Sequence, residues 1–473
     1  MLKKLSTTDA SFLAVESPNA PMHVGWLCTF SPPADGPRPS FEQLRDHITG
    51  RLAHSARYRQ RLVRLPLRAW EPAWVDDPEF DFARHVVEAE GSDISEIVDG
   101  AMSSHLDRDR PLWKMWLAPE LPDGSIGFVG KAHHCMVDGL AALELVGLLF
   151  DESPEPEPTE PVSWTPRPLP SRRVLGVVRL NELAERVRGA IRLPLRVLSS
   201  DGGTRSLGRW TARLVGALVD FLRPAPMSPF NGPSSPWRHQ ARTSHPLSEL
   251  RAVKDHFDTS LNDVVLAVTA GALRRYMERT GQIVERLKVI VPVNVRDPTA
   301  DPDDLGNQLS FMWVELPCQE PDPIRRLEAL HASTKKRKES RRAEGASVLV
   351  AAVSYGPRFL KRLVSSLFAS RRTANLIVSN LIGPPIPLYM QGCAIEEIYP
   401  LVPLTDHHGL SIGLMTVRDT ACFSLYADAT SLPDADALAA DVDASVAELV
   451  ALTADPAAPG SAQPSDLMAG APR

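Results

Sequence analysis

Cysteine is scarce in this sequence of 473 residues, and no two cysteines form a C-x-x-C pair. The five cysteines are Cys28, Cys135, Cys318, Cys393 and Cys422. An odd number of scattered thiols argues against a disulfide scaffold and against a zinc knuckle. We therefore expect reduced thiols in a cytoplasmic protein.

Long apolar segments are missing as well. Lys3 and Lys4 are not followed by an apolar segment, so we expect no secretory signal peptide. No uncharged apolar run reaches the roughly 18 residues that a membrane-spanning helix needs. These absences predict a soluble or peripheral protein.

A basic excess is also absent, because 52 Lys and Arg residues stand against 58 Asp and Glu residues and the net charge is -6. A nucleic-acid-binding protein usually carries a positive balance, so we expect no nucleic-acid partner. The fractions of hydrophobic residues, 43%, and charged residues, 23%, are those of a globular protein. The chain is too long for one ordinary core, which predicts two domains.

Composition divides the chain into four parts. We expect an N-terminal lobe at 1–150, a Pro- and Glu-rich linker with an Arg-rich helical segment at 151–226, a C-terminal lobe at 227–454 and a disordered tail at 455–473. The Arg-rich stretch 172–223 holds eleven Arg against four acidic residues. It is interpreted either as amphipathic helices that cover a core or cross between domains, or as a contact with a membrane or lipid-droplet surface.

Hydrophobic periodicity and turn residues predict an alternation of strands and helices in both lobes. Strands are expected at 22–30, 125–132, 287–295, 308–316, 375–379, 410–417 and 421–427, and the stretch 73–87 is expected to contain a strand followed by a turn at 74–78. Helices are expected at 41–52, 94–105, 140–150, 261–276, 323–342 and 435–452. The pattern predicts two α/β halves.

The segment with the most chemistry follows the predicted strand 125–132 and reads His133-His134-Cys135-Met136-Val137-Asp138-Gly139. Acyl transfer to an alcohol needs a base that removes the hydroxyl proton, and a neutral histidine suits this near pH 7. An acidic residue four positions on can orient the histidine directly or lock the loop. Gly139 lets the chain turn tightly into the predicted helix from 140.

Three other interpretations of this segment stay open. The histidines and Asp138 could ligate zinc, although no third ligand is obvious nearby. The two histidines could be a structural pair with satisfied hydrogen bonds. Cys135 could be a nucleophile, but neighbours on an extended segment point apart, which does not favour attack with help from His134.

The His-His-x-x-x-Asp-Gly segment after a strand resembles the bacterial wax ester synthase/diacylglycerol acyltransferase family. This family is part of the CoA-dependent acyltransferases, which include chloramphenicol acetyltransferase and peptide-synthetase condensation domains. The likeness runs along nearly the whole chain. Further matching segments lie at 5–13, 21–24, 74–78, 111–113, 230–232, 261–264, 292–296, 306–307 and 426–434. One departure is Ile382, which stands where the family usually has the first proline of Asn-Val-Pro-Gly-Pro.

The resemblance implies an α/β fold with two chloramphenicol-acetyltransferase-like lobes, each a mixed β-sheet flanked by helices, and a tunnel between them. It implies transfer of a long-chain acyl group from acyl-CoA to diacylglycerol, giving triacylglycerol, and to long-chain alcohols, giving wax esters. Acyl-CoA is then a substrate, and no metal or bound cofactor is expected. The alternatives are a condensation-type acyltransferase with another acceptor and a non-catalytic lipid-binding or droplet protein.

The resemblance also suggests roles for single residues. His134 is expected to be the base and His133 to support it. Asp138 is expected to hold the loop, by analogy through a pair with Arg296, and Gly139 to shape it.

On the substrate side we expect Asn262, Asp263, Arg296 and Asn380. A helix cap is the alternative for the pair Asn262-Asp263. A lipid substrate further implies a cytoplasmic protein held peripherally at the inner face of the membrane or on lipid droplets.

Overall fold

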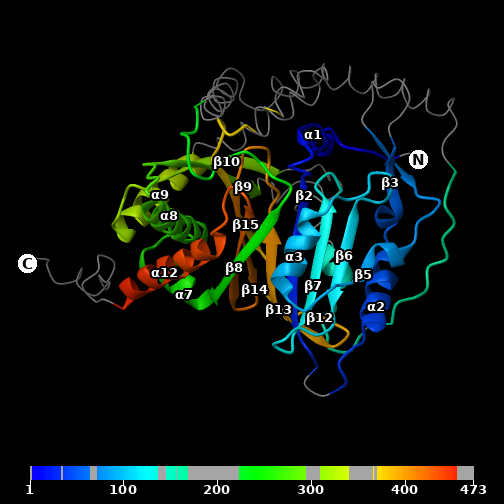
Figure 1. The fold of residues 1–473 in the computed structure, drawn as a ribbon. Helices are drawn as coiled ribbons and strands as arrows, with labels where there is room; N and C mark the ends of the chain where they lie inside the picture. Colours follow the sequence, from blue (N-terminus) through cyan, green and yellow to red (C-terminus); the bar gives the residue numbers. More distant parts are fainter. Residues whose placement is uncertain are drawn as a thin grey trace, which may run out of the picture.

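The computed structural model describes residues 3–33, 36–63, 72–136, 145–156, 158–168, 223–294, 309–339, 366 and 370–454. These residues form two six-stranded sheets and one three-stranded sheet. The two larger sheets stand side by side, and each carries helices (Figure 1). The three-stranded sheet consists of β1 (Lys3–Lys4), β4 (Ala73–Asp76) and β3 (Gln60–Val63).

The first large sheet belongs mainly to the N-terminal part of the chain. Its strands, in spatial order, are β12 (Tyr389–Met390), β13 (Cys393–Leu401), β2 (His23–Ser31), β7 (Ile126–His133), β6 (Trp113–Ala118) and β5 (Val86–Glu88). All neighbours are antiparallel except β5 and β6, so the sheet is mixed. The helices α2 (Phe41–Ala53) and α3 (Ile94–Ser103) pack against it.

Two strands of this sheet come from the far end of the chain. β13 pairs antiparallel with β2, and Tyr399 lies opposite Leu27. In Figure 1 the orange β13 lies next to the blue β2, although more than 360 residues separate them. A division of the chain into consecutive lobes does not describe this exchange, because residues 389–401 complete the sheet that residues 23–133 begin.

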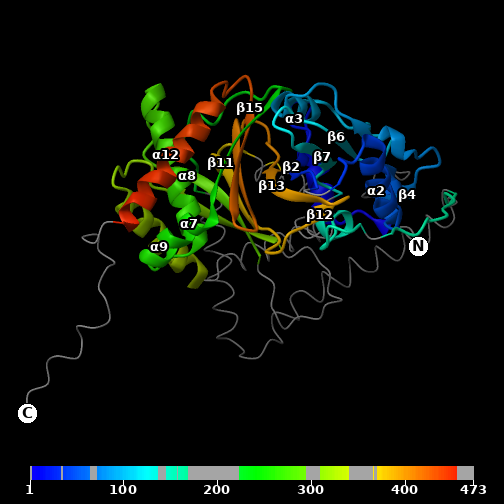
Figure 2. The same ribbon diagram turned by 90° about the horizontal axis from the view of Figure 1, so that it is seen from below.

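The second large sheet is also mixed. Its strands, in spatial order, are β10 (Leu309–Leu316), β9 (Leu287–Asn294), β11 (Leu376–Ile382), β14 (Leu410–Val417), β15 (Thr420–Asp428) and β8 (Arg238–Pro246). β11 runs parallel to both of its neighbours, and the other pairs are antiparallel. Four helices gather on one side of this sheet (Figure 2): α7 (Leu247–His256), α8 (Leu261–Thr280), α9 (Pro323–Glu339) and α12 (Ala435–Thr453).

The helix α8 is the centre of the second core. Ser260 caps its first turn, and a left-handed glycine, Gly281 (φ 68°), ends it. Every residue from Asp263 to Leu273 is buried, because α7, α9, α12 and the sheet surround the helix. A helix that is buried on all sides is apolar along its whole length, and this stretch is apolar apart from the aspartate and one threonine.

The other side of the second sheet packs against the N-terminal lobe. Met415 and Val417 of β14 and Tyr426 of β15 belong to the core cluster of the first lobe, whereas alternate residues of β14 face the helices. Gly413 permits the close approach of β13, since a Cβ there would lie 2.9 Å from the carbonyl oxygen of Pro400. The two lobes therefore share a packed junction.

A second junction joins α3 to the edge strand β8. The backbone N–H of Arg238 donates to Ser103 Oγ over 2.9 Å, and the N–H of Gln240 donates to Asp99 Oδ1 over 2.9 Å. The Asp99 Oδ2 atom lies 2.6 Å from Nδ1 of His239. Two side chains one helical turn apart thus satisfy donors of an otherwise open sheet edge.

The expected fold is confirmed, with two lobes that each contain a mixed sheet flanked by helices. The predicted strands and helices appear within a few residues of their expected bounds, although the helix expected at 140–150 is described only from 145. The Arg-rich stretch, except Arg223, and the tail lie outside the described residues. In the described part of the chain, no helix is both long enough and apolar enough to cross a membrane.

Candidate active site

The two histidines lie where a buried central strand ends. All eight residues of β7 are buried. His133 is its last residue and lies opposite His23 of the neighbouring strand β2. A turn follows at 134–136, in which the N–H of Met136 donates to the His133 carbonyl oxygen over 2.8 Å. The N–H of His134 donates to the carbonyl oxygen of Met22 over 2.9 Å. The turn is therefore fixed to the rigid frame of the sheet.

His133 is a buried, neutral histidine. Its Nδ1 atom accepts a hydrogen bond from the backbone N–H of Cys135 over 3.0 Å, so the neutral ring carries its proton on Nε2. Burial, with contributions from Arg108 and His134, lowers its pKa to about 3. Its Nε2 atom lies 3.7 Å from Glu16 Oε1. His133 thus holds the turn in place and stays uncharged at neutral pH.

His134 is the more accessible of the two histidines and is half-buried. Its ring stacks on the ring of Phe12, with 3.7 Å between the centroids and 11° between the planes. Phe12 belongs to α1 (Thr7–Val15), which lies next to the end of β2 (Figure 1). The imidazole is thus presented at the surface of a fixed turn with one face covered.

Charged residues flank the pair. Glu16, which follows α1, forms an ion pair with Arg108 and lies near His133. On β7 the buried ammonium of Lys131 donates to the carbonyl oxygens of Ala101, over 2.5 Å, and Ser104, over 2.8 Å. Burial lowers the pKa of Lys131 to about 7. These contacts fasten β7 to the C-terminal end of α3, where helix carbonyls favour a cation.

The cysteine alternative has no support from the geometry. Cys135 is 3% exposed, and burial raises the pKa of its thiol to about 12. A thiol with that pKa is protonated at neutral pH, whereas a nucleophile must be a thiolate. For the metal alternative, no group of three or more His, Cys, Asp or Glu side chains suited to hold an ion occurs among the described residues.

The other expected site residues lie apart or outside the described chain. Asp138, Gly139 and Arg296 fall outside the described residues. Asn262 is half-buried in the first turn of α8. Asn380 is half-buried on β11, and its buried Oδ1 atom has no hydrogen-bond partner within the described residues.

Asp263 forms a helix cap, the alternative that the sequence left open. Ser260 and Asp263 make a reciprocal capping box at the start of α8. The carboxylate also accepts from Thr334 Oγ1 over 2.6 Å and lies 2.9 Å from His331 Nδ1. Burial alone raises the pKa of this carboxyl, but the hydrogen bonds from Thr334, His331 and Ser260 outweigh burial and lower it.

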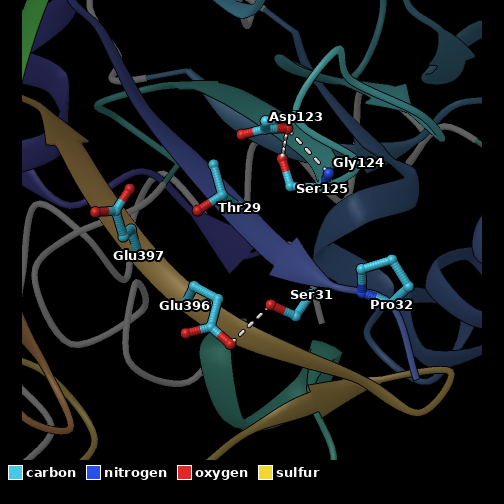
Figure 3. A pocket seen from close by; sticks show the side chains of 8 residues that line it. All are labelled: Thr29, Ser31, Pro32, Asp123, Gly124, Ser125, Glu396 and Glu397. Carbon is cyan, nitrogen blue, oxygen red and sulfur yellow. Dashed lines mark hydrogen bonds between the residues drawn. The ribbon is translucent and has the colours of Figure 1, made fainter. Parts of the chain in front are cut away.

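A surface pocket of about 350 Å³ lies elsewhere (Figure 3). Acidic side chains line it, among them Asp123, Glu396 and Glu397. It contains Thr29 and Ser31, at the opposite end of β2 from His23, so a distance of roughly 25 Å separates it from the histidine turn at ~3.3 Å per strand residue. Because this pocket lies far from the two histidines, we locate the candidate active site at the histidine turn and not in the pocket.

Four residues near the histidines are not expected from the sequence: Phe12, Glu16, Arg108 and Lys131. Phe12 lies in the segment 5–13, which resembles a segment of the family, but that resemblance assigns it no role. The position of Phe12 and Glu16 beside the histidines needs the fold, because the first 22 residues supply a helix and a backbone contact to the turn at 134–136.

The comparisons with known proteins agree with this geometry. Residues 5–265 match the wax ester synthase/diacylglycerol acyltransferase catalytic domain, and residues 305–450 match the WS/DGAT C-terminal domain. The protein named Probable diacylglycerol O-acyltransferase tgs1 of Mycobacterium tuberculosis is 28% identical over 462 residues, which cover 96% of each chain.

Two solved structures are similar in fold. The wax ester synthase/diacylglycerol acyltransferase of Marinobacter aquaeolei VT8 has a TM-score of 0.68 at 24% identity and covers 96% of this chain and 100% of its own. The first condensation domain of the calcium-dependent antibiotic synthetase has a TM-score of 0.60 at 15% identity, with 98% of both chains covered.

The fold is of the chloramphenicol-acetyltransferase type, with two lobes that each hold a mixed sheet flanked by helices. The match of both domains over most of the chain is more specific. The chain belongs to the wax ester synthase/diacylglycerol acyltransferase family.

Proposed function

We propose that the protein transfers a long-chain acyl group from acyl-CoA to diacylglycerol, and also to long-chain alcohols, with His134 as the general base. The products are triacylglycerol and wax esters, and acyl-CoA is a substrate. The observation that carries the proposal is the half-exposed imidazole of His134 on a turn that β2 and β7 hold rigidly. The family membership and the names of the relatives support the reaction class.

The proposed step conserves atoms and charge. A ring nitrogen of His134 takes the proton of the acceptor hydroxyl as its oxygen attacks the thioester carbonyl. A C–O bond forms, the C–S bond breaks, and the same proton passes from the imidazolium to the leaving CoA sulfur. General-base catalysis of this kind contributes about 10²–10⁴-fold to the rate.

We assign His133 a supporting role in this scheme, because its hydrogen bond from Cys135 shapes the turn that presents His134. Asp138 and Gly139 follow in sequence and are proposed to hold and shape the loop, with Arg296 as the partner of Asp138. Asn262 and Asn380 are the proposed polar groups on the substrate side, and the unpartnered Oδ1 of Asn380 supports this for one of them. For Asp263 the capping box supports a role in positioning α8. The substrates are proposed to meet in a tunnel between the lobes.

The test is release of free CoA from palmitoyl-CoA by the purified protein, with dioleoylglycerol and then hexadecanol as acceptor. His134→Ala is expected to lower kcat by about 10²–10⁴-fold while the chain stays folded. His245→Ala is the matched control, because His245 lies on β8 beside Asp443 and away from the turn. The ratio of the two rates identifies the preferred alcohol.

The outcomes separate the alternatives. Full activity of His134→Ala contradicts the assigned base. Release with neither acceptor from a folded wild-type protein favours a condensation-type enzyme with another acceptor, and binding of the lipids without release favours the lipid-binding protein. Removal of residues 455–473 is expected to leave the rate unchanged, as the proposed division into lobes, linker and tail requires.

We also propose that the protein meets its lipid substrates peripherally, at the inner face of the membrane or on lipid droplets. The charge of the Arg-rich stretch 172–223 and the exposure of Ile382, at 78%, support this. Binding to vesicles with anionic phosphatidylserine should weaken as salt rises, because screening reduces attraction between exposed charges. Absence of vesicle binding at low salt contradicts the electrostatic contact.

A further inference from the structure

The side chain of Phe12 in α1 stacks on His134. The next residue, Leu13, packs against the N-terminal core cluster, whereas Phe12 is not among the described side chains that do so. The phenyl ring lies 3.7 Å from the imidazole in a nearly parallel arrangement. Phe12 therefore contributes to the turn more than to the core.

Flat stacking has a definite effect on an imidazole. It covers one face of the ring and does not cover the edge, where both nitrogens lie. Rotation of the imidazole about its Cβ–Cγ bond would drive the ring edge into the phenyl group. The stack thus fixes the plane in which the two nitrogens can give or take a proton.

The helix that carries Phe12 is capped at its start and fastened to the C-terminal lobe just after its end. At the start of α1, Ser6 Oγ accepts the N–H of Asp9 over 3.0 Å. Directly after α1, Ser17 Oγ donates to Asp406 Oδ1 over 2.8 Å, and Asn19 Nδ2 donates to the Ser234 carbonyl oxygen over 2.9 Å. The helix that carries Phe12 is therefore fastened to loops of the C-terminal lobe, while Phe12 touches the histidine of the N-terminal lobe.

We infer that Phe12 is a positioning residue for His134: its aromatic ring, anchored through residues 17–19 to the C-terminal lobe, holds the imidazole in the plane required for proton transfer. The inference rests on the proposed role of His134. A flat aromatic ring is required, so an aliphatic side chain of similar volume cannot replace it.

The test compares Phe12→Leu with Phe12→Tyr and Phe12→Trp in the CoA-release assay, using the full chain. Phe12→Leu is expected to lower kcat by about 10-fold to 100-fold, as a misplaced reacting group does, with KM for palmitoyl-CoA and for the acceptor little changed. The two aromatic variants are expected to restore most of the rate. Phe257→Leu is the matched control, because Phe257 makes an edge-on contact with His256 in the C-terminal lobe (4.7 Å, 76°).

Any of three results overturns the inference: a wild-type kcat in Phe12→Leu, an equal loss of kcat in all three variants, or a change in KM with kcat unaffected. A measurement that does not depend on enzyme activity tests the inference separately from the proposed function. The rate at which diethylpyrocarbonate modifies His134, followed by mass spectrometry of the peptide, should rise in Phe12→Leu and not in Phe12→Tyr. An unchanged rate in Phe12→Leu overturns the stacking role even if the wild-type protein proves to have another acceptor.

Discussion

Replacing Lys131 with methionine is expected to change how the stability of the folded chain depends on pH. Burial lowers the pKa of Lys131 from 10.5 to about 7. Below pH 7 both the folded and the unfolded chain hold the proton, and the folded state bears the full cost of a buried ammonium. Between pH 7 and 10.5 the unfolded chain binds a proton that the folded chain has released, so the free energy of unfolding rises with pH.

The difference between the two pKa values sets the size of the effect. At ~1.4 kcal/mol for each pKa unit, the part of the stability that changes with pH is at most about 5 kcal/mol. The methionine variant loses this pH dependence. It also leaves the carbonyl oxygens of Ala101 and Ser104 without the ammonium donor, at a cost of ~1–3 kcal/mol for each unsatisfied group.

Urea unfolding of both chains at pH 6, 7, 8 and 9 measures the difference. The stability of the wild type relative to Lys131→Met is expected to rise across this range, and groups that titrate in both chains cancel. Lys254→Met, which removes an ammonium on α7 that is one-third exposed, serves as the control for the loss of a lysine. If the difference in free energy of unfolding between the wild type and Lys131→Met does not change with pH, the argument that burial destabilises this ammonium is refuted.

Three further results are expected. His239 lies between Asp99 and Asp436, and chiefly its hydrogen bond to Asp99 raises its pKa to about 9. Its contribution to the free energy of unfolding is complete below about pH 6.5 and is lost as pH rises through 9. In urea unfolding between about pH 7 and 9.5, the free energy of unfolding should therefore fall less in His239→Ala than in the wild type. Gly130→Ala should destabilise the chain by at least ~1–3 kcal/mol in thermal unfolding, since its Cβ would lie 2.1 Å from the Trp26 ring. Cys135→Ala should leave kcat nearly unchanged, and a loss comparable to that of His134→Ala would revive the thiol as nucleophile.

The sequence predicted the elements well because burial leaves a local pattern. The strand at 410–417 and the helix at 261–276 could be read from their apolar periodicity and turn residues alone. The pairing of β13 with β2 could not, because periodicity reports that a strand is buried and not which strand lies beside it.

The candidate site divides in the same way. The histidine pair could be predicted from its chemistry, because only a few types of side chain can act as the base that removes a hydroxyl proton. Phe12 and Glu16 were not, because an aromatic or acidic residue more than 100 positions away gives no local sign that it touches a histidine. Asp263 had two interpretations, a substrate-side residue and a helix cap. Its hydrogen bonds with Ser260, which form the capping box, show the cap, and its contacts with Thr334 and His331 could not be predicted from the sequence.

The position of β13 has a consequence for how the chain acquires its structure during synthesis. The strand β2 leaves the ribosome early, but its partner at 393–401 is made only after most of the second lobe. Until then one edge of β2 stays open, and open edges pair readily with other chains. The first lobe must therefore wait for the last fifth of the polypeptide, so fragments that end before residue 393 should aggregate, and closing this edge should be a late event in folding.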